Sequence, residues 1–456
     1  MDTPNTPADR SALEQLSKEE LVDLVLRMAQ QNDQLVKRVD ELEKRLGKGD
    51  PPAFVKANRP DRQKKERKKR NLHFCRKREK PTKTAVHVPA DCPDCGRKLK
   101  DGWLAYRRQV IDIKPTPVEI TEHEVYGRYC GVCGKNVVPK LDLSRQVLGA
   151  HRVGIELMSL VAYLKEVGRM SVRTIRHFLR AMYKVHLSVG EITKVLHTVA
   201  KKGEETYKGL IKQIQSSPYV HADETGWRED GQNGYLWVAA TPTLRCFVHR
   251  KSRAGEVAEE LLGENFNNIL ITDFYGGYNR FACIKQKCWV HLLRDLDKLR
   301  DNFPDDQAVC SWIDTVADVY KRAKDYQKEC RGGKSLRCGL FDRQRMGKRF
   351  EAELQDLAVP HAGKQSPAPQ RILAERIINF LPELFTFVEF PDVPSENNAA
   401  ERAIRPAVIA RKVCGGTRSE KGSATKATLM SLFQTWQARS LDPIAQCKNM
   451  LAGPSP

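Results

Sequence analysis

The chain has 456 residues and a formal net charge of +21, with 78 Lys and Arg against 57 Asp and Glu. This length allows about two to four domains around a large core. It contains no run of eighteen apolar residues, and Met1-Asp2-Thr3-Pro4 begins neither a signal peptide nor a membrane anchor. We therefore expect a soluble cytoplasmic protein without a membrane partner. The excess positive charge favours a polyanionic partner, most simply nucleic acid.

A heptad pattern near the N-terminus predicts a parallel coiled coil over residues 12–48. One seam is Leu21, Met28, Leu35 and Leu42, and the other is Val25, Asn32, Val39 and Leu46. Asn32 at an a position favours a homodimer in one register, because two amides pair across the seam only when the helices are aligned. The alternative is an amphipathic helix that packs on its own domain.

Residues 50–84 form a basic segment that we expect to be a disordered linker. From Lys56 to Lys83 the chain has fourteen Lys or Arg and three acidic residues. Its densest part consists of Lys64, Lys65, Arg67, Lys68, Lys69 and Arg70. These cations suit DNA phosphates, which would give salt-dependent binding without sequence preference. The alternative is a solvated linker.

Two cysteine repeats lie within residues 85–145. They are Cys92-Pro93-Asp94-Cys95-Gly96 and Cys130-Gly131-Val132-Cys133-Gly134. Four thiolates at this spacing suit one structural, tetrahedral zinc ion with no open position for catalysis. The other cysteines of the thirteen are scattered, which favours buried thiols over a disulfide framework. Unliganded core cysteines are the alternative for the two repeats.

Residues 150–205 have the pattern of a helical module. Ser171 is placed to cap one helix, and Ser188 with Glu191 forms a capping box that opens the next. Two short helices in succession resemble a helix-turn-helix, whose second helix would offer Thr193, Lys194 and His197 to a DNA groove. A plain helical bundle that packs on the core explains the pattern equally well.

Two apolar segments each end on an aspartate. Pro218-Tyr219-Val220 leads to Asp223, and Asn268 to Thr272 leads to Asp273. Between them the pattern predicts strands over 234–240 and 244–249 and a helix over 254–262. Neighbouring strand ends could bring two carboxylates together on hard divalent cations. The alternative is that both residues are ordinary turn aspartates.

Four motifs together resemble the transposases of the insertion sequence 66 family. They are Asp223-Glu224-Thr225-Gly226-Trp227-Arg228, Thr272-Asp273-Phe274-Tyr275-Gly276-Gly277-Tyr278, Cys288-Trp289-Val290-His291-Leu292-Leu293-Arg294-Asp295, and Ser395-Glu396-Asn397-Asn398-Ala399-Ala400-Glu401-Arg402. The resemblance implies a multidomain α/β protein with a ribonuclease-H-like DDE catalytic domain over residues 206–415. A helical insertion at about 292–390 would interrupt this domain, and a C-terminal segment over 416–456 would follow it.

The resemblance implies a catalytic triad of Asp223, Asp273 and Glu401 that binds two Mg²⁺ or Mn²⁺ ions. Glu396 and Glu224 are alternatives for the third acid. We favour Glu401 because Arg405 and Lys412 lie on its face of a helix and could hold a phosphate. An ion pair between Glu401 and Arg405 is the alternative.

Further basic residues are candidates for contact with DNA. His291 belongs to the Cys288-x-x-His291 motif, and Arg411 lies next to Lys412 before a glycine-rich basic loop. A buried histidine and a mobile surface loop are the alternatives. Two helical stripes predict the insertion: Trp312, Val316, Val319 and Ala323, then Leu373, Ile377, Phe380 and Leu384.

The function that the resemblance implies is cutting and joining of DNA. The substrates would be the terminal inverted repeats of a mobile element and a target DNA in a bacterial nucleoid, with further element-encoded proteins as accessory partners. A catalytically silent DNA-binding protein derived from such an enzyme, or a metal-dependent nuclease without joining activity, are the alternatives.

Overall fold

The computed structural model describes residues 151–332, 338–363 and 366–453 without a break, and shorter stretches before them. The shorter stretches are 81, 84–86, 89–91, 93–98, 104, 118–130, 132, 135–139 and 142–149. The chain forms two compact units, Met1–Ile111 and Asp112–Pro456. The predicted coiled coil and the basic residues from Lys64 to Arg70 lie outside the described residues. In the described part, no helix is both long and apolar enough to cross a membrane.

Each cysteine repeat is flanked by a short antiparallel pairing. In the first unit, Asp91 and Lys98 form a bridge around a turn in which Gly96 has a φ of +69°. In the second unit, β1 (Arg128–Cys130) pairs with β2 (Lys135–Val137). Glycine tolerates the positive φ of such a turn without steric cost. Cys92 and Cys133 lie outside the described residues, so the zinc site stays a prediction.

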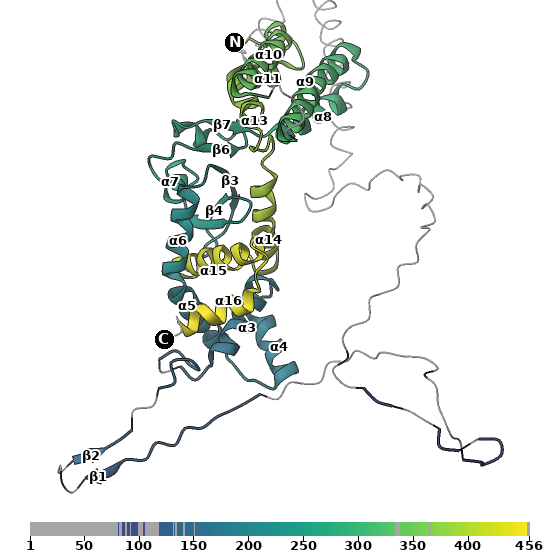
Figure 1. Ribbon diagram of the computed structural model, residues 1–456. Coiled ribbons are helices and arrows are strands. Elements are labelled where there is room, and N and C mark those ends of the chain that lie inside the picture. The colour runs from purple at the N-terminus through teal and green to yellow at the C-terminus, as the bar shows by residue number, and fades with distance from the viewer. Residues whose placement is uncertain are drawn as a thin grey trace, which may run out of the picture. The chain divides into compact units, whose positions relative to one another are not determined.

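The second unit continues with helices α3 (Ile155–Glu166), α4 (Val172–Tyr183), α5 (Val189–Lys202) and α6 (Glu204–Gln215). Both predicted caps are confirmed. The Ser171 hydroxyl accepts the backbone N–H of Thr174, and Ser188 and Glu191 form a reciprocal capping box. Figure 1 shows these helices beside α16 (Pro443–Ala452), which packs on α3.

A five-stranded mixed sheet has the order β5-β4-β3-β6-β7. Its strands are β3 (Tyr219–Gly226), β4 (Tyr235–Ala240), β5 (Arg245–Arg250), β6 (Ile269–Thr272) and β7 (Lys285–Lys287). β3, β4 and β5 are antiparallel, and β6 runs parallel to both β3 and β7. Helix α7 (Glu256–Leu262) precedes β6, as the pattern predicted, and the 3₁₀ turn η1 (Gly276–Arg280) follows it.

The prediction that a strand ends at Asp223 was wrong. β3 continues to Gly226, because β4 goes on pairing with it, with Asp223 opposite Val238. Asp273 does follow the last residue of β6 directly. The parallel pairing of β3 with β6 extends from Tyr219 opposite Ile269 to His221 opposite Ile271. Asp223 therefore lies inside a strand but beyond this parallel pairing.

Helix α14 (Asn398–Cys414) covers one face of the sheet, against β3 and β4. Its inward residues include Ala400, Ala403, Ala407 and Ala410, all buried against apolar side chains of the sheet. Small side chains at this helical spacing allow the helix backbone to approach the strands closely. Sequence therefore sets both the face that α14 buries and its short distance from β3 and β4.

Helix α15 (Glu420–Ala438) covers the edge of the sheet at β5. The backbone N–H groups of Arg245 and Phe247 donate to the hydroxyls of Thr435 and Ser431, at 3.0 and 2.8 Å. Unpaired groups of an edge strand would otherwise invite pairing with another chain. Two side chains of α15 thus take the place of a neighbouring strand.

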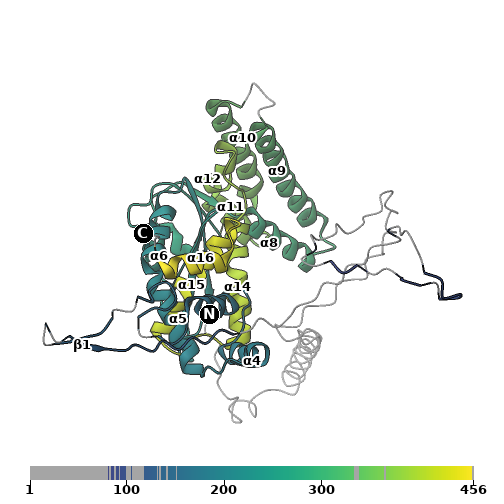
Figure 2. The same cartoon turned by 60° about the horizontal axis from the view of Figure 1, so that its bottom comes forward.

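A helical insertion separates β7 from α14 along the chain, and Figure 2 shows its helices α8 to α12 grouped together. It comprises α8 (Trp289–Asn302), α9 (Gln307–Arg331), α10 (Leu340–Ala358), η2 (Val359–His361), α11 (Arg371–Asn379), α12 (Leu381–Leu384) and α13 (Thr386–Glu389). The predicted stripe from Trp312 to Ala323 is buried in α9.

The second predicted stripe of the insertion is interrupted. It divides at Phe380, which has a φ of −119°, just before α12 with Pro382 in its first turn. Proline lacks the N–H that would continue the preceding helix. The insertion also contains a Cys330–Cys338 disulfide, which the distribution of cysteines did not predict.

Candidate active site

Of the two predicted aspartates, Asp223 lies in β3 and Asp273 directly follows the neighbouring strand β6. Continuing the parallel register from His221 and Ile271 by two residues places Asp223 alongside Asp273. Adjacent strands are about 4.8 Å apart, and residues two positions along share a face. His221 is on the α14 side, where its Nδ1 hydrogen-bonds Asn397 at 3.1 Å. Asp223 and Asp273 therefore both face the side of the sheet that α14 covers.

Neither aspartate is neutralised by the protein. Asp223 accepts the backbone N–H of Glu224 at 2.9 Å, and Asp273 accepts that of Tyr275 at 3.0 Å. Among the described residues, neither has a cationic side chain within 4.0 Å. Burial is the main reason that the pKa of Asp223 is raised to about 7, and the charges of nearby carboxylates add to it. Those carboxylates belong to Glu224, Asp273 and Glu401.

Glu401 lies in the first turn of α14 and faces the insertion. Arg294 of α8 donates to both of its carboxylate oxygens at 3.1 Å, and Nε2 of His291 is 3.8 Å away. The alternative partner Arg405 forms no ion pair within the described part of the chain. Glu401 is thus held by α8, and its negative charge also contributes to the raised pKa of Asp223.

Glu224 points to the opposite face of the sheet, as alternation along β3 requires. One of its oxygens binds Arg253 at 2.8 Å, and the other accepts the hydroxyl of Tyr278 at 2.8 Å. The Arg253 guanidinium also lies over the Tyr275 ring, 4.2 Å from its centroid. Both oxygens of Glu224 are therefore satisfied by protein groups.

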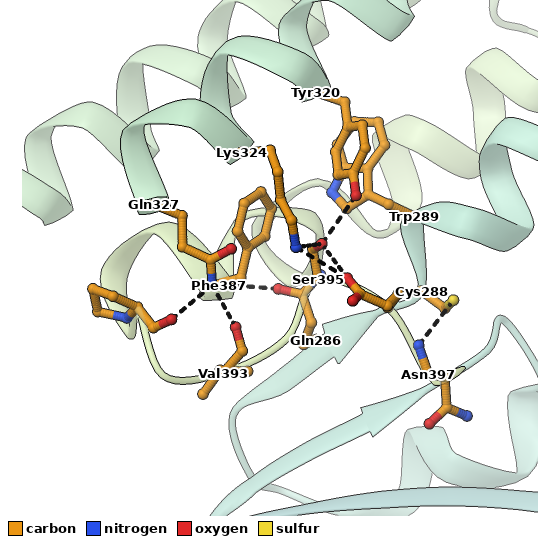
Figure 3. A network of polar contacts seen from close by, with 12 residues as sticks. Gln286, Cys288, Trp289, Tyr320, Lys324, Gln327, Phe387, Val393, Ser395 and Asn397 are labelled. Carbon is orange, nitrogen blue, oxygen red and sulfur yellow. Dashed lines mark hydrogen bonds and ion pairs between the residues drawn. The ribbon is translucent and has the colours of Figure 1, made fainter. Parts of the chain in front are cut away.

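Glu396 turns toward the insertion. It accepts the hydroxyl of Ser395 at 2.7 Å and the ammonium of Lys324 at 3.1 Å. In Figure 3, Lys324 and Tyr320 of α9 converge on Ser395, and Cys288 faces the backbone of Asn397. Partial burial acts against ionisation, but the Ser395 hydrogen bond and the Lys324 charge lower the pKa of Glu396. Glu396 therefore anchors the segment before α14.

Asn397 joins the segments that carry the three acids, a role that sequence reasoning missed. Its side-chain amide donates to the carbonyl of Ala222, directly before Asp223, at 2.8 Å. Its backbone N–H donates to the Cys288 sulfur at 3.1 Å, and Cys288 N–H donates to the carbonyl of Thr272 at 2.9 Å. The available sequence signal was only its place in the Asn397-Asn398 pair before a helix, and the structure shows that Asn397 is fully buried.

One further cluster has donor atoms suited to a metal ion. Potential ligand atoms of Cys288, His291 and Glu401 lie within 4.8 Å of one another. Among the described residues, no other group of three or more His, Cys or carboxylate side chains has its ligand atoms this close together. Burial raises the pKa of the Cys288 thiol, which opposes the thiolate that a metal would need. The hydrogen bond from Asn397 gives Cys288 a role in positioning.

The predicted DNA-contacting residues of the second unit lie in different environments. Lys194, Arg405 and Lys412 are exposed, whereas His291 is partly buried beside Glu401. Arg411 donates to the carbonyl of Gly226 at the end of β3, so it fastens α14 to the sheet. Thus only three of these five side chains are free to meet a ligand.

Comparison with known proteins assigns the chain to a family. Residues 151–425, more than half of the chain, match the model described as "Transposase IS66 family". The protein belongs to the IS66 family of transposases. Its relatives include the uncharacterized proteins y4qI and y4jO of Sinorhizobium fredii, which are 30% identical over 263 residues and 40% identical over 53 residues.

The matches span only part of these relatives. The match to y4qI covers 52% of this chain and 47% of y4qI, and the match to y4jO covers 12% and 16%. This chain therefore spans about half the length of y4qI and a smaller share of y4jO.

Proposed function

We propose that this transposase cuts and joins the DNA ends of a mobile element with a DDE site formed by Asp223, Asp273 and Glu401. The observation that supports the proposal is that the β3–β6 register, continued by two residues, sets Asp223 beside Asp273, and that the charge of Glu401 in the first turn of α14 also acts on Asp223. The strand order and directions support a ribonuclease-H-like core for residues 206–415, interrupted by the helical insertion.

The donor set fits divalent cations. Carboxylate oxygens are the ligands that Mg²⁺ and Mn²⁺ prefer, and Asp223 and Asp273 have no cationic partner among the described residues. When bound, two such ions would supply activation of the attacking oxygen and stabilisation of the leaving oxygen in a displacement at phosphorus. Glu401 is preferred as third ligand because Glu224 points to the opposite face of the sheet, to Arg253 and Tyr278, and Glu396 is bound to Lys324 of the insertion.

The chain's own cations would position the DNA. Arg405 and Lys412 are seven residues apart on the exposed face of α14, the helix that carries Glu401. Contacts to phosphates fix the register of a duplex without reading its sequence. Arg294 holds Glu401 in place before a substrate arrives. Beyond the site, we propose a zinc ion on Cys92, Cys95, Cys130 and Cys133, a coiled-coil homodimer, and element-encoded accessory proteins.

Cleavage of labelled DNA from the ends of the element that encodes this chain tests the proposal. In Mg²⁺ or Mn²⁺, we expect wild type and Glu396→Gln to cut the DNA and Glu401→Gln to lose cutting while still binding it. Loss only in Glu396→Gln would move the third ligand. No cutting by wild type would favour a silent DNA-binding protein, and cutting without joining of a free 3′-hydroxyl end would favour a nuclease.

A further inference from the structure

Helix α4 lies in a segment that contains no acidic residue. Between Glu166 and Glu191 the chain has no Asp or Glu but five Lys or Arg: Arg169, Arg173, Arg176, Arg180 and Lys184. All five are exposed. The positive charge of this segment is therefore not offset by any acidic residue within the segment itself.

The arginines of α4 form one stripe. Arg173, Arg176 and Arg180 are spaced by three and four residues, which places them on one face of a helix. The opposite face carries Ile175 and Leu179, both fully buried. Packing of these two residues against α3 and α5 fixes the stripe toward solvent.

The stripe also lacks ion-pair partners. Among the described residues, none of its three arginines has a carboxylate within 4.0 Å. Some exposed arginines elsewhere are compensated: Arg322 of α9 binds Asp318 and Glu353, and Arg250 binds Glu260. An unpaired row of guanidinium groups attracts a polyanion strongly.

Helix α5, the second helix of the predicted helix-turn-helix, offers much less. It packs on α3, α4, α6, α15 and α16. His197 is bonded to the Thr425 hydroxyl at 2.7 Å, and burial lowers its pKa, which disfavours its charged form. Lys194 remains exposed. The first helix of the pair carries the row of unpaired arginines, whereas the exposed cations of α5 are Lys194, Lys201 and Lys202.

We infer that α4 binds the phosphate backbone of duplex DNA through Arg173, Arg176 and Arg180. The inference rests on the proposed function, which supplies DNA as the polyanion. Seven residues of helix extend about 10 Å, close to the axial length of about three base pairs. Guanidinium groups bind phosphate oxygens with two parallel hydrogen bonds, which an ammonium cannot do.

The test measures affinity of the full chain for a random 30-bp duplex at several salt concentrations. The variant is Arg173→Gln, Arg176→Gln, Arg180→Gln. Its matched control is Lys201→Gln, Lys202→Gln, Lys212→Gln, which removes the same charge from exposed positions on α5 and α6. A third variant replaces the three arginines by lysine. Thermal unfolding checks that all of them fold.

The logarithm of the association constant falls linearly with the logarithm of the salt concentration. Losing three phosphate contacts should make this slope shallower by about 2 to 3 in the glutamine variant. The control should change by less than about 1, and the lysine variant should keep most of the slope. Equal slopes in the glutamine variant and wild type, equal losses in variant and control, or no duplex binding by wild type would overturn the inference. Cleavage assays separate it from the proposed function: an active enzyme with an unchanged slope refutes only the role of α4, and a changed slope without cleavage refutes only the enzyme.

Discussion

Successive residues of β3 send one carboxylate to each face of the sheet. Glu224 meets Arg253 and the Tyr278 hydroxyl, so both of its oxygens are engaged. Asp223 faces α14, accepts one backbone N–H, and is surrounded by other carboxylates. The two neighbours carry the same kind of group, a carboxyl, in opposite environments.

Glu224 is therefore a structural acid, whereas Asp223 needs a ligand from outside the protein. A buried carboxylate beside like charges is destabilising unless a cation or a proton compensates it. On the Tyr278 face the protein provides the cation. On the α14 face it provides none within ion-pair distance of Asp223 in the described region. The uncompensated carboxylates on that face therefore lower the stability of the metal-free protein, and the same carboxylates can bind a cation from solution.

Replacing Asp223 by Asn should have the largest effect. We expect cleavage to fall by at least about 10³-fold, roughly 4 kcal/mol, because a ligand is lost. The metal-free protein should nevertheless become more stable, by roughly 1 to 3 kcal/mol at pH 8. Thermal or urea unfolding in EDTA measures this gain.

The pH dependence of that gain follows from the raised pKa. Asp223 has a pKa of about 7 in the folded chain against an ordinary 3.8. Its contribution to wild-type stability is complete below about pH 4 and is lost as the pH rises through 7. The advantage of Asp223→Asn should therefore grow over this interval and then level off. Asp230→Asn, at an exposed turn with φ of +50°, is the control and should show no such trend.

Asn397→Ala should have the next largest effect, because it removes the amide that ties α14 to the backbone before Asp223. We expect cleavage to fall about 10- to 100-fold with DNA affinity unchanged, as for residues that orient metal ligands. Stability should fall by about 1 to 3 kcal/mol, because buried partners are left unpaired. Asn398→Ala, one residue on, is the control; an equal loss there would argue against the network.

Glu224→Gln should have the smallest effect. The amide oxygen can still accept from Arg253, and the amide NH2 group can donate to the Tyr278 hydroxyl oxygen, so we expect cleavage within about threefold of wild type. The free energy of unfolding should change by about 1 kcal/mol or less, since Arg253 is half exposed. The same cleavage and unfolding assays apply. A loss as large as that of Asp223→Asn would make Glu224 the metal ligand instead.

Sequence patterns predicted those parts of the core that depend on local signals. The β-branched run before Asp273 became β6, and the capping serines opened α4 and α5 where expected. The register of two parallel strands then brought Asp223 and Asp273 together. Such signals succeed because periodicity and capping are decided within a few residues of chain.

Other features depend on contacts between distant segments. Lys285-Gln286-Lys287 reads as a polar loop, yet it is β7, and Lys287 is fully buried. The side chain of Gln286 bonds the backbone of Leu384 and Phe387, and the Lys287 ammonium donates to Thr272. Each polar group is satisfied by a partner that no local pattern could reveal. The pairing of Glu401 with Arg294, 107 positions away, was hidden for the same reason.

The chain leaves the core for the insertion and returns to it at nearly one point. Trp289 N–H donates to the Ser395 carbonyl at 3.0 Å, and Asn397 N–H donates to Cys288. With its two ends fastened together, the excursion between them is a closed loop whose length costs little further entropy. Its helices can therefore be lengthened, shortened or exchanged over evolution while Asp273 and Glu401 keep their spacing. The insertion is an exchangeable helical unit attached to the core at one fixed point.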